Sequence, residues 1–428
     1  MLIIYINARR TLKSGDAIKS IKDNNARNVT LNITSILQCP VSGTDLSFVD
    51  EQGLREMNTR MEQGVLRHLN GKQVQLHLES ALISSDRRFV YPVVDGIMIL
   101  LPSLAITQKE DAAAIDGCAS TETDQVMRFY DELGWQVGKA GHYLDAEKFA
   151  DLRPVSREYV HRCHLRINQH IAPRGMYLLD VASGPVQYPE YLTYSEGYDR
   201  RICADVSFSA LQAAKAKLGD RGVYIQCDIT QLPLKEASVD GFVSLHTIYH
   251  VPAEKQETAF RELERVLMPE RTGVVVYSWG SHCLAMKLLT AEIHPFYAMK
   301  QWLKKALPPS FVCWLKKISG KPVPVGGMMQ SGVERPAGKG TKLYFYPHNY
   351  RWFQQNVASR GEWRILVWRS VSVAFLKRYV HARLMGKAFL AALFRIENAF
   401  PRFWGRFGQY PLMVYRKPKA KSIDADGL

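Results

Sequence analysis

The sequence predicts an α/β protein in which helices cover both faces of a mostly parallel sheet, with a small β-rich domain before it. From residue 175 onward, apolar runs typical of strands alternate with helical segments. Several of these runs end at an Asp, a pattern that is typical of buried strands whose carboxyl ends border a ligand-binding site. The chain has 428 residues, of which 46% are hydrophobic, enough for a packed core and a second domain.

Three regions precede the alternating pattern. Residues 1–34 are polar and irregular and are expected to form an extension. Residues 35–105 are expected to be β-rich, with a turn at Asp95-Gly96 between two apolar runs. Residues 106–175 begin as a small, polar linker and continue as helices that cap the next domain. In the second of these helices, one face is predicted to be buried: Tyr159, Cys163, Ile167 and Ile171.

Residues 176–417 are predicted to form the α/β domain. Its helix 207–218 starts at Ser207 and ends at Gly219, and a second helix spans 253–267. An insertion rich in Pro, Gly and Lys is expected at 281–345, and residues 418–428 form a tail. Strands are expected at 176–181, 201–206, 222–229, 239–249, 273–279, 364–373 and 410–417.

The charge is unevenly distributed. Residues 281–428 hold 25 Lys and Arg against 6 Asp and Glu, within a chain of net charge +15. Such asymmetry indicates an anionic partner, although a solubilising surface is an equal alternative. The basic segment 374–394 is predicted to be helical. On one continuous helix, Arg383 and Lys387 share an arc with Leu376 and Val380, which disfavours a membrane-surface helix.

Composition also bounds location and metal content. No apolar run is long enough to span a bilayer, and the apolar start is too short for a signal peptide. The seven cysteines are scattered without a CxxC pair, which suits a reducing compartment. We therefore expect a cytoplasmic protein, soluble or peripheral to the inner face of a membrane. No metal is predicted: the "HRCH" stretch at 161–164 lies on the helix with the buried face described above.

Three acids follow three successive strands. Asp180 precedes the small residues Ala182, Ser183 and Gly184, and Asp205 and Asp228 end the next two strands. Ligands of open α/β sheets bind beyond the carboxyl ends of the strands, so these acids define a nucleoside site. The chain lacks the G-x-G-x-x-G pattern of a pyrophosphate loop. An acid just before the loop instead suits a cationic ligand, such as an ammonium or a sulfonium.

Residues 176–280 resemble the class I S-adenosylmethionine-dependent methyltransferases, in particular the subgroup that includes ubiquinone and menaquinone methyltransferases. The matching pieces, in family order, are "LLDVASGP", "CADVSFSAL", "CDITQLPL", "DGFVSLHTIYHVP" and "ELERVLMPE…GVVVYSW", with "YPLMVYRKPK" as closing strand. The resemblance implies a Rossmann-like sheet of seven strands and S-adenosyl-L-methionine as cofactor.

Roles carry over residue by residue. The resemblance implies that residues 180–184 line the methionine part, that Asp205 with Val206 binds the ribose, and that Asp228 with Ile229 binds the adenine. Leu245 and His246 would lie beneath the sulfonium, and Tyr130 would close over the cofactor. Ala182, Pro185 and Val186 stand where the family usually has glycines, which predicts a looser approach to the cofactor.

His250 is the first candidate for a general base, because it follows the fourth strand, where this fold holds its acceptor. His246 is the second, and packing against the cofactor is the alternative role for it. A general base is needed only if the acceptor loses a proton during transfer. The expected acceptor is a small molecule, a lipid-linked intermediate or a glycan. Alternatives are an RNA or protein acceptor, or a catalytically inactive methyltransferase-fold partner protein.

Residues 35–102 resemble the small zinc-ribbon protein that partners tRNA and translation-factor methyltransferases. The similar pieces are "ILQCPVSGTDL" and "YPVVDGIMILLP". Of the four cysteines of such a ribbon only Cys39 is present, and Ser42 takes the second position. Four soft ligands are needed for the tetrahedral site, so the resemblance implies a metal-free domain whose role is docking. A chance β-hairpin is the alternative.

Overall fold

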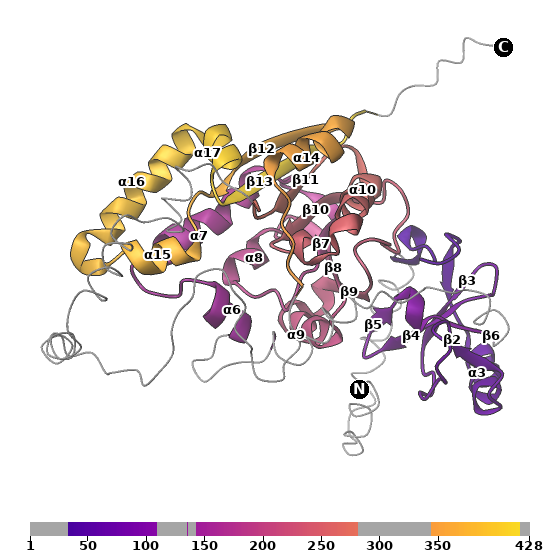
Figure 1. Ribbon diagram of the computed structural model, residues 1–428. Helices are drawn as coiled ribbons and strands as arrows, with labels where there is room; N and C mark the ends of the chain where they lie inside the picture. Colours follow the sequence, from indigo (N-terminus) through magenta and orange to yellow (C-terminus); the bar gives the residue numbers. More distant parts are fainter. Residues whose placement is uncertain (1–32, 109–134, 136–142, 281–343, 420–428) are drawn as a thin grey trace, which may run out of the picture.

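The computed structural model describes residues 33–108, 135, 143–280 and 344–419 (Figure 1). Its strands form one sheet with the order β1-β3-β4-β5-β9-β8-β7-β10-β11-β13-β12, in which β2 and β6 lie off this path. The seven strands from β9 to β12 are numbered 3-2-1-4-5-7-6 along the chain, and only β13 runs antiparallel to its neighbours in this part. The predicted α/β fold is confirmed, but the sheet has more than seven strands.

The strands of this domain match the predicted apolar runs. All of them except β7 end one to four residues earlier than predicted, and the structure shows why for β9 and β10. β9 stops before Asp228, whose Oδ1 accepts hydrogen bonds from the backbone and hydroxyl of Thr230 and so starts a turn. β10 stops before His246, which has a φ of 60°. The strands are β7 (Gly175–Val181), β8 (Tyr198–Asp205), β9 (Gly222–Gln226), β10 (Val239–Leu245), β11 (Leu267–Val276), β12 (Glu362–Arg369) and β13 (Tyr410–Arg416).

α9 and α10 form where the cap and the apolar spacing predict them. Ser207 caps α9, accepting a hydrogen bond from the Ala210 backbone, and Gly219 follows its last residue with a φ of 53°. α10 buries Phe260 and Leu263 against the sheet. The helices are α6 (Leu144–Phe149), α7 (Arg157–Leu165), α8 (Pro189–Thr193), α9 (Phe208–Leu218), α10 (Gln256–Val266), α14 (Tyr350–Asn356), α15 (Val373–Tyr379), α16 (Gly386–Ala399) and α17 (Pro401–Phe407).

The N-terminal domain continues the main sheet. Its strand β5 lies parallel to β9, with Ile97 opposite Tyr224 and Ile99 opposite Gln226. The predicted turn is present, with left-handed backbone at Asp95 and Gly96 between β4 and β5. The domain comprises β1 (Leu46–Phe48), α3 (Glu51–Glu62), β2 (Leu66–His68), β3 (Ala81–Ser84), β4 (Val90–Val94), β5 (Ile97–Ile99) and β6 (Ile106–Gln108).

A hydrogen-bonded cluster surrounds the single ribbon-like cysteine. The buried thiol of Cys39 lies 3.1 Å from the Tyr91 hydroxyl and accepts a hydrogen bond from the backbone of Ser42. The Ser84 hydroxyl donates to Asp86, and hydrogen bonds from Ser84 and Ser42 help to lower the pKa of Asp86, against the opposing effect of burial. Among the described residues, no group of three or more His, Cys, Asp or Glu is placed to hold a metal ion.

Truncation of Ile97 tests the join between the domains. Ile97 is fully buried and packs in the same core cluster as Tyr224 and Leu211 of the α/β domain. We expect Ile97→Ala to lower the free energy of unfolding by about 2–4 kcal/mol, the usual range for such a cavity. Urea unfolding measures this. Ile83→Ala, in the partly buried rim of the small N-terminal core, is the control. Equal, small losses would contradict a shared core.

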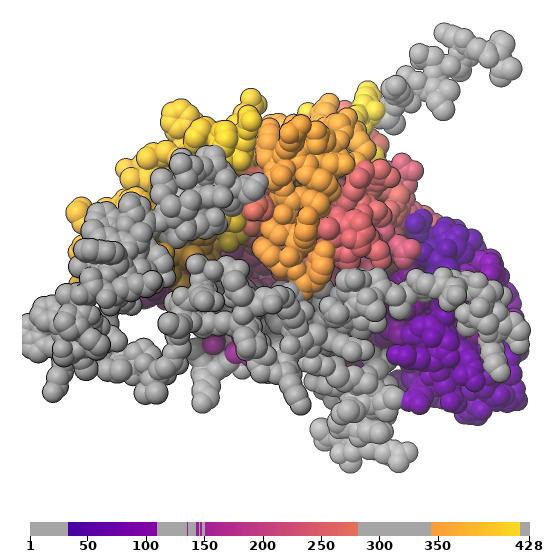
Figure 2. Space-filling model, viewed as in Figure 1, coloured from indigo at the N-terminus to yellow at the C-terminus, as the bar shows by residue number. Residues whose placement is uncertain are grey.

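The C-terminal helices correct one sequence expectation. A single helix over 374–394 is wrong, because the chain leaves helical geometry at Val380 and His381 and turns at Met385, whose φ is 53°. α15 and α16 are therefore separate helices. The arc predicted to join Leu376 and Val380 with Arg383 and Lys387 does not exist. These helices lie at the end of the molecule opposite the N-terminal domain (Figures 1 and 2). No helix in the described part of the chain is both long and apolar enough to cross a bilayer.

Candidate cofactor and acceptor site

The predicted site residues gather at one edge of the sheet. β7, β8, β9 and β10 are parallel, so their carboxyl ends face the same way. The strand order reverses between β7 and β10, where open α/β sheets bind their ligands. The loop 182–186 follows β7 at this point, Asp205 ends β8, Asp228 follows β9, and Leu245 ends β10.

The loop after β7 keeps a glycine-like backbone where it lacks glycines. Ala182, Gly184 and Val186 have φ values of 53°, 53° and 49°. This region is strained for Ala and more so for a β-branched Val, at a cost of about 1–3 kcal/mol per residue. Such strain persists only where the surroundings impose it, and it concentrates at functional sites. The loop thus retains the shape of a ligand-binding turn despite the substitutions.

Two side chains hold this loop in place. Lys217, in the last turn of α9, donates hydrogen bonds from Nζ to the carbonyl oxygens of Pro185 (2.7 Å) and Val186 (2.9 Å). The Trp135 ring lies over Gly184, so close that a Cβ built on the glycine would come within 2.9 Å of it. Gly184 is therefore required both by its φ and by the indole. Neither Lys217 nor Trp135 was predicted from the sequence.

Asp205 ties the loop to the end of β8. Its carboxylate oxygens accept hydrogen bonds from the backbone of Gly184 and of Ser207, both at 2.8 Å. The side chain is buried, with 6% of the residue exposed. Hydrogen bonds to a charged acceptor are the strong kind, about 1.5–3 kcal/mol each. Asp205 thus sets the position of the loop relative to the second strand.

Asp180 has a different partner from the one expected. Its Oδ2 accepts hydrogen bonds from Nε and Nη2 of Arg201, on the neighbouring strand β8. Both side chains are buried, and Arg201 also donates to the Tyr191 carbonyl. The ion pair neutralises Asp180, so this acid brings no net charge for a cationic ligand. Its evident role is to fix β7 to β8 just below the loop.

The other predicted cofactor residues lie along the same edge. Asp228 is partly buried in the turn that it organises, and Ile229 is buried beside it. The Val206 carbonyl accepts a hydrogen bond from the Gln226 amide, which joins the ends of β8 and β9. Leu245 is partly buried at the end of β10, and Ser183 is buried within the loop. Tyr130 lies outside the described residues.

His246 belongs to an aromatic cluster. Its ring meets those of Trp368 and Tyr410 with centroids 4.5 Å and 5.3 Å apart, and Trp368 in turn meets His164 on α7. Burial, with Arg369 nearby, lowers the pKa of His246 well below its usual value. Because the ring packs against both Trp368 and Tyr410, packing is the better-supported role for His246. We call these residues the aromatic wall: His164, Tyr188, Tyr191, His246, Trp368 and Tyr410.

His250 is oriented by a backbone carbonyl. Its Nδ1 lies 2.7 Å from the oxygen of Tyr344, and because a carbonyl only accepts, Nδ1 carries the proton. The tautomer therefore leaves the lone pair on Nε2, as a general base requires. Burial lowers the pKa of His250 to about 4, partly opposed by the hydrogen bond to Tyr344. The neutral form prevails at pH 7.

The buried histidines predict acid lability. Burial lowers the pKa of His164 to about 3, lowers that of His250 to about 4 and lowers that of His246 as well. Each stays neutral in the fold but takes up a proton on unfolding below its unfolded pKa of about 6.5. Stability is thus complete above pH 6.5 and is lost as pH falls toward 4, by up to ~1.4 kcal/mol per pH unit per histidine.

Urea unfolding between pH 7.5 and 5.0 measures this slope. His246→Phe should flatten it, because one proton fewer is taken up. An unchanged slope in His246→Phe, or a parental protein equally stable at both ends of the range, would contradict the neutral burial of these histidines.

The chemistry of the edge fits a nucleoside cofactor in most respects. Gly184 offers backbone without a side chain, and the Asp205 carboxylate, which only accepts hydrogen bonds, suits the hydroxyls of a ribose. The neutralised Asp180 is the one departure. Sequence reasoning missed several residues of the site. Each of them contacts the site from another segment of the chain: Trp135, Arg201, Lys217, Trp368 and Tyr410.

Comparison with known proteins gives one family match, which lies within the α/β domain. Residues 179–275 match the family described as methyltransferase domain. No curated protein matches. Among solved structures, the chain is similar to the complex between the Haloferax volcanii Trm112 methyltransferase activator and the putative methyltransferase, at 15% identity and TM-score 0.35, covering 62% of this chain and 92% of that one.

A second similar structure is geranyl diphosphate C-methyltransferase from Streptomyces coelicolor A3(2), crystallised with Mg2+, geranyl diphosphate and S-adenosyl-L-homocysteine. Identity is 13% and the TM-score 0.38, with 70% of this chain and 98% of that chain covered. The [4+2]-cyclase SpnF is similar at 16% identity and TM-score 0.34, over 61% of this chain and 82% of its own. These similarities assign no acceptor.

The match spans the chain from the end of β7 to β11, within the α/β fold described above, and it describes a methyltransferase domain. A methyltransferase domain supports S-adenosyl-L-methionine as the cofactor.

Proposed function

We propose that this protein transfers a methyl group from S-adenosylmethionine to a small-molecule, lipid-linked or glycan acceptor. The observation that carries the proposal is the loop after β7. Ala182 and Val186 keep a left-handed backbone that glycine adopts without strain, and Asp205 and Lys217 hold the loop in that shape. A fold that had lost its ligand would have no reason to maintain this strain.

Each predicted residue then has a distinct task. Asp205 holds the ribose, Asp228 with Ile229 holds the adenine, and the loop 182–184 lies against the methionine part. When bound, S-adenosylmethionine supplies a methyl group on a sulfonium. The protein contributes alignment of the acceptor, worth up to several kcal/mol of the barrier. His250 would take a proton from the acceptor through Nε2, and the aromatic wall would line the acceptor side.

Transfer of radioactive methyl tests the proposal. The purified chain is incubated with methyl-tritiated S-adenosylmethionine and a cell extract, which is then separated into organic-soluble, polar small-molecule, RNA and protein fractions. We expect label in the organic-soluble or small-molecule fraction, and at least tenfold less with Asp205→Asn. Label in RNA or protein alone would contradict the acceptor class.

A catalytically inactive partner protein is the second candidate. Asp180 is neutralised by Arg201, and Ala182 and Val186 replace glycines, so affinity for a cationic cofactor is expected to be lower than with an unpaired acid. In this case no fraction would be labelled, although circular dichroism shows that the protein is folded.

We further propose that residues 35–105 are a ribbon-like domain without metal whose role is docking, and that the catalytic domain belongs with the ubiquinone and menaquinone methyltransferases that it resembles. The pairing of β5 with β9 supports docking. The cluster of Cys39 with Tyr91 and Ser42 supports the metal-free ribbon. In it the Cys39 thiol is engaged in hydrogen bonds at the position where a zinc ribbon would use a cysteine as a metal ligand.

A further inference from the structure

The C-terminal helices expose a concentrated apolar surface. Of the eleven large apolar side chains that the described residues expose, six lie between residues 384 and 403. Met385 is 76% exposed and Phe400 is 62% exposed. Scattered apolar residues are ordinary on a soluble protein, but a contiguous group indicates a partner. We call this group the apolar stripe: Leu384, Met385, Phe389, Ile396, Phe400 and Phe403.

α16 is apolar on two faces. One face packs against the protein through Leu390 and the buried Glu397. The outer face carries Phe389 and Ile396, seven residues apart, and the exposed Ala392 lies between them on the same side. A surface helix normally presents polar residues on its outer face. The exposed side of α16 carries Phe, Ala and Ile together with the exposed Arg395, so it combines an apolar surface with positive charge.

The exposed charge within residues 377–407 is entirely positive. Glu397 is the only acid between residues 377 and 407, and it is fully buried, bonded to Tyr159, Arg166 and the Ser370 backbone. Its charge therefore does not face solvent. The cations, by contrast, are all exposed: Lys377, Arg378, Arg383, Lys387, Arg395, Arg402 and Arg406.

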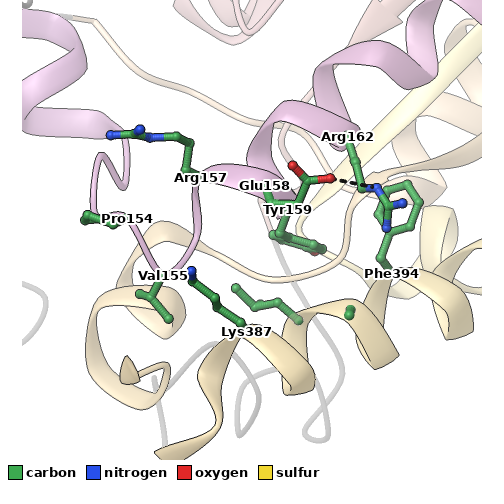
Figure 3. A pocket seen from close by; sticks show the side chains of 10 residues that line it. Pro154, Val155, Arg157, Glu158, Tyr159, Arg162, Lys387 and Phe394 are labelled. Carbon is green, nitrogen blue, oxygen red and sulfur yellow. Dashed lines mark ion pairs between the residues drawn. The ribbon is translucent and has the colours of Figure 1, made fainter. Parts of the chain in front are cut away.

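A hollow between α7 and α16 has the same mixed chemistry. It has a volume of about 540 Å³, and Leu390 is among the apolar side chains that line it. Figure 3 shows two others, Val155 and Phe394. Its charged lining residues are Arg157, Lys387, Glu158 and Arg162, and the last two form an ion pair at 3.1 Å. Three cations and one acid give the rim a positive charge. An anionic head group with an apolar tail fits this combination.

We propose that η9 (Ala382–Leu384), α16 and α17 dock on an anionic lipid bilayer. The apolar stripe enters the boundary between head groups and acyl chains, and the arginines contact the phosphates. Amphipathic interfacial helices bind through these two terms. A nucleic acid would use the cations but would leave Leu384, Met385 and Ile396 exposed. The excursion 370–409 leaves from β12 and returns to β13 at the edge where β10 and β11 end, so docking brings the bilayer to the acceptor side.

Vesicle flotation of the full chain tests the proposal. The probes are vesicles of phosphatidylcholine alone and vesicles with one third phosphatidylglycerol, at 50 mM and 300 mM salt. We expect at least tenfold stronger binding to the anionic vesicles, weakened by salt because the charges are exposed. Equal binding to both vesicle types, or binding to neither, would overturn the proposal.

Matched variants locate the surface. Phe389→Glu with Ile396→Glu should reduce anionic vesicle binding at least tenfold, while Val65→Glu, an exposed apolar residue of the N-terminal domain, should not. Arg395→Gln with Arg402→Gln should also reduce binding, and Arg55→Gln on α3 is the control. Circular dichroism confirms that each variant is folded. Unchanged binding of the stripe variant, or competition by RNA equal to that of anionic vesicles, would overturn the proposal.

This docking does not depend on methyl transfer. Cofactor binding by the stripe variant is expected to equal that of the parental protein, because Phe389 and Ile396 are exposed residues of α16 and do not belong to the strand ends that carry the loop. If the protein binds anionic vesicles but transfers no methyl group, the proposed activity is contradicted and the proposed docking surface is not.

Discussion

Replacing Arg201 by methionine should destabilise the protein more than any other single change considered. Arg201 is fully buried, and its guanidinium bonds to Asp180 and to the Tyr191 carbonyl. Its removal leaves the Asp180 carboxylate buried without a counter-charge. Breaking a buried ion pair on one side typically lowers the free energy of unfolding by about 3–5 kcal/mol. Urea unfolding at pH 7.5 measures this loss.

The double variant Asp180→Asn with Arg201→Met separates charge from packing. With both charges gone, most of the lost stability should return, because desolvation no longer opposes folding. Arg200→Met, on the same strand but partly exposed, is the control and should change the free energy of unfolding little. If Arg201→Met costs no more than Arg200→Met, the ion pair is not what joins β7 to β8 below the loop.

Substituting Gly184 by alanine should have the second large effect, on cofactor binding as well as on stability. A Cβ at this position meets the Trp135 ring at 2.9 Å, and the φ of 53° is strained for any residue with a Cβ. Either the indole or the loop must move. We expect a loss of about 1–3 kcal/mol in the free energy of unfolding and at least a tenfold weaker affinity for S-adenosylmethionine.

Two controls distinguish crowding from backbone strain. Gly64 has a φ of 72°, and a Cβ added to it would meet no other atom within 4 Å, so Gly64→Ala reports the strain alone. Gly184→Ala with Trp135→Ala removes the crowding and should recover part of the lost affinity. Identical losses for Gly184→Ala and Gly64→Ala, with unchanged cofactor affinity, would contradict the role assigned to the loop and to Trp135.

Local patterns in the sequence were sufficient for the elements of the α/β domain. The Ser207 cap and Gly219 bound α9 as predicted, and apolar runs located β7, β8 and β10. The acids at or just beyond the ends of β7, β8 and β9 predicted one shared edge, because parallel strands end on the same side. These inferences depend on near neighbours in the chain, which is why the sequence alone carries them.

Contacts between distant segments were beyond such patterns. Nothing near Asp180 indicates that Arg201 will bond to it, since the pairing depends on the register of β7 with β8. The parallel pairing of β5 with β9 likewise joins residues more than a hundred positions apart. The break at His381 was missed because no Pro or Gly precedes it. Its consequence, an α16 with an apolar outer face, became visible only in the structure.

Calorimetric titration of the purified protein with S-adenosylmethionine tests the central claim most directly. The comparison is with Asp205→Asn, which loses the charged acceptor of the Gly184 backbone, and with Asp199→Asn, an exposed acid on the same strand. We predict micromolar binding by the parental chain and by Asp199→Asn. Asp205→Asn should bind at least tenfold more weakly, as the loss of a charge-assisted hydrogen bond requires. A folded parental protein that releases no heat, or an Asp205→Asn variant that binds equally well, would contradict the account.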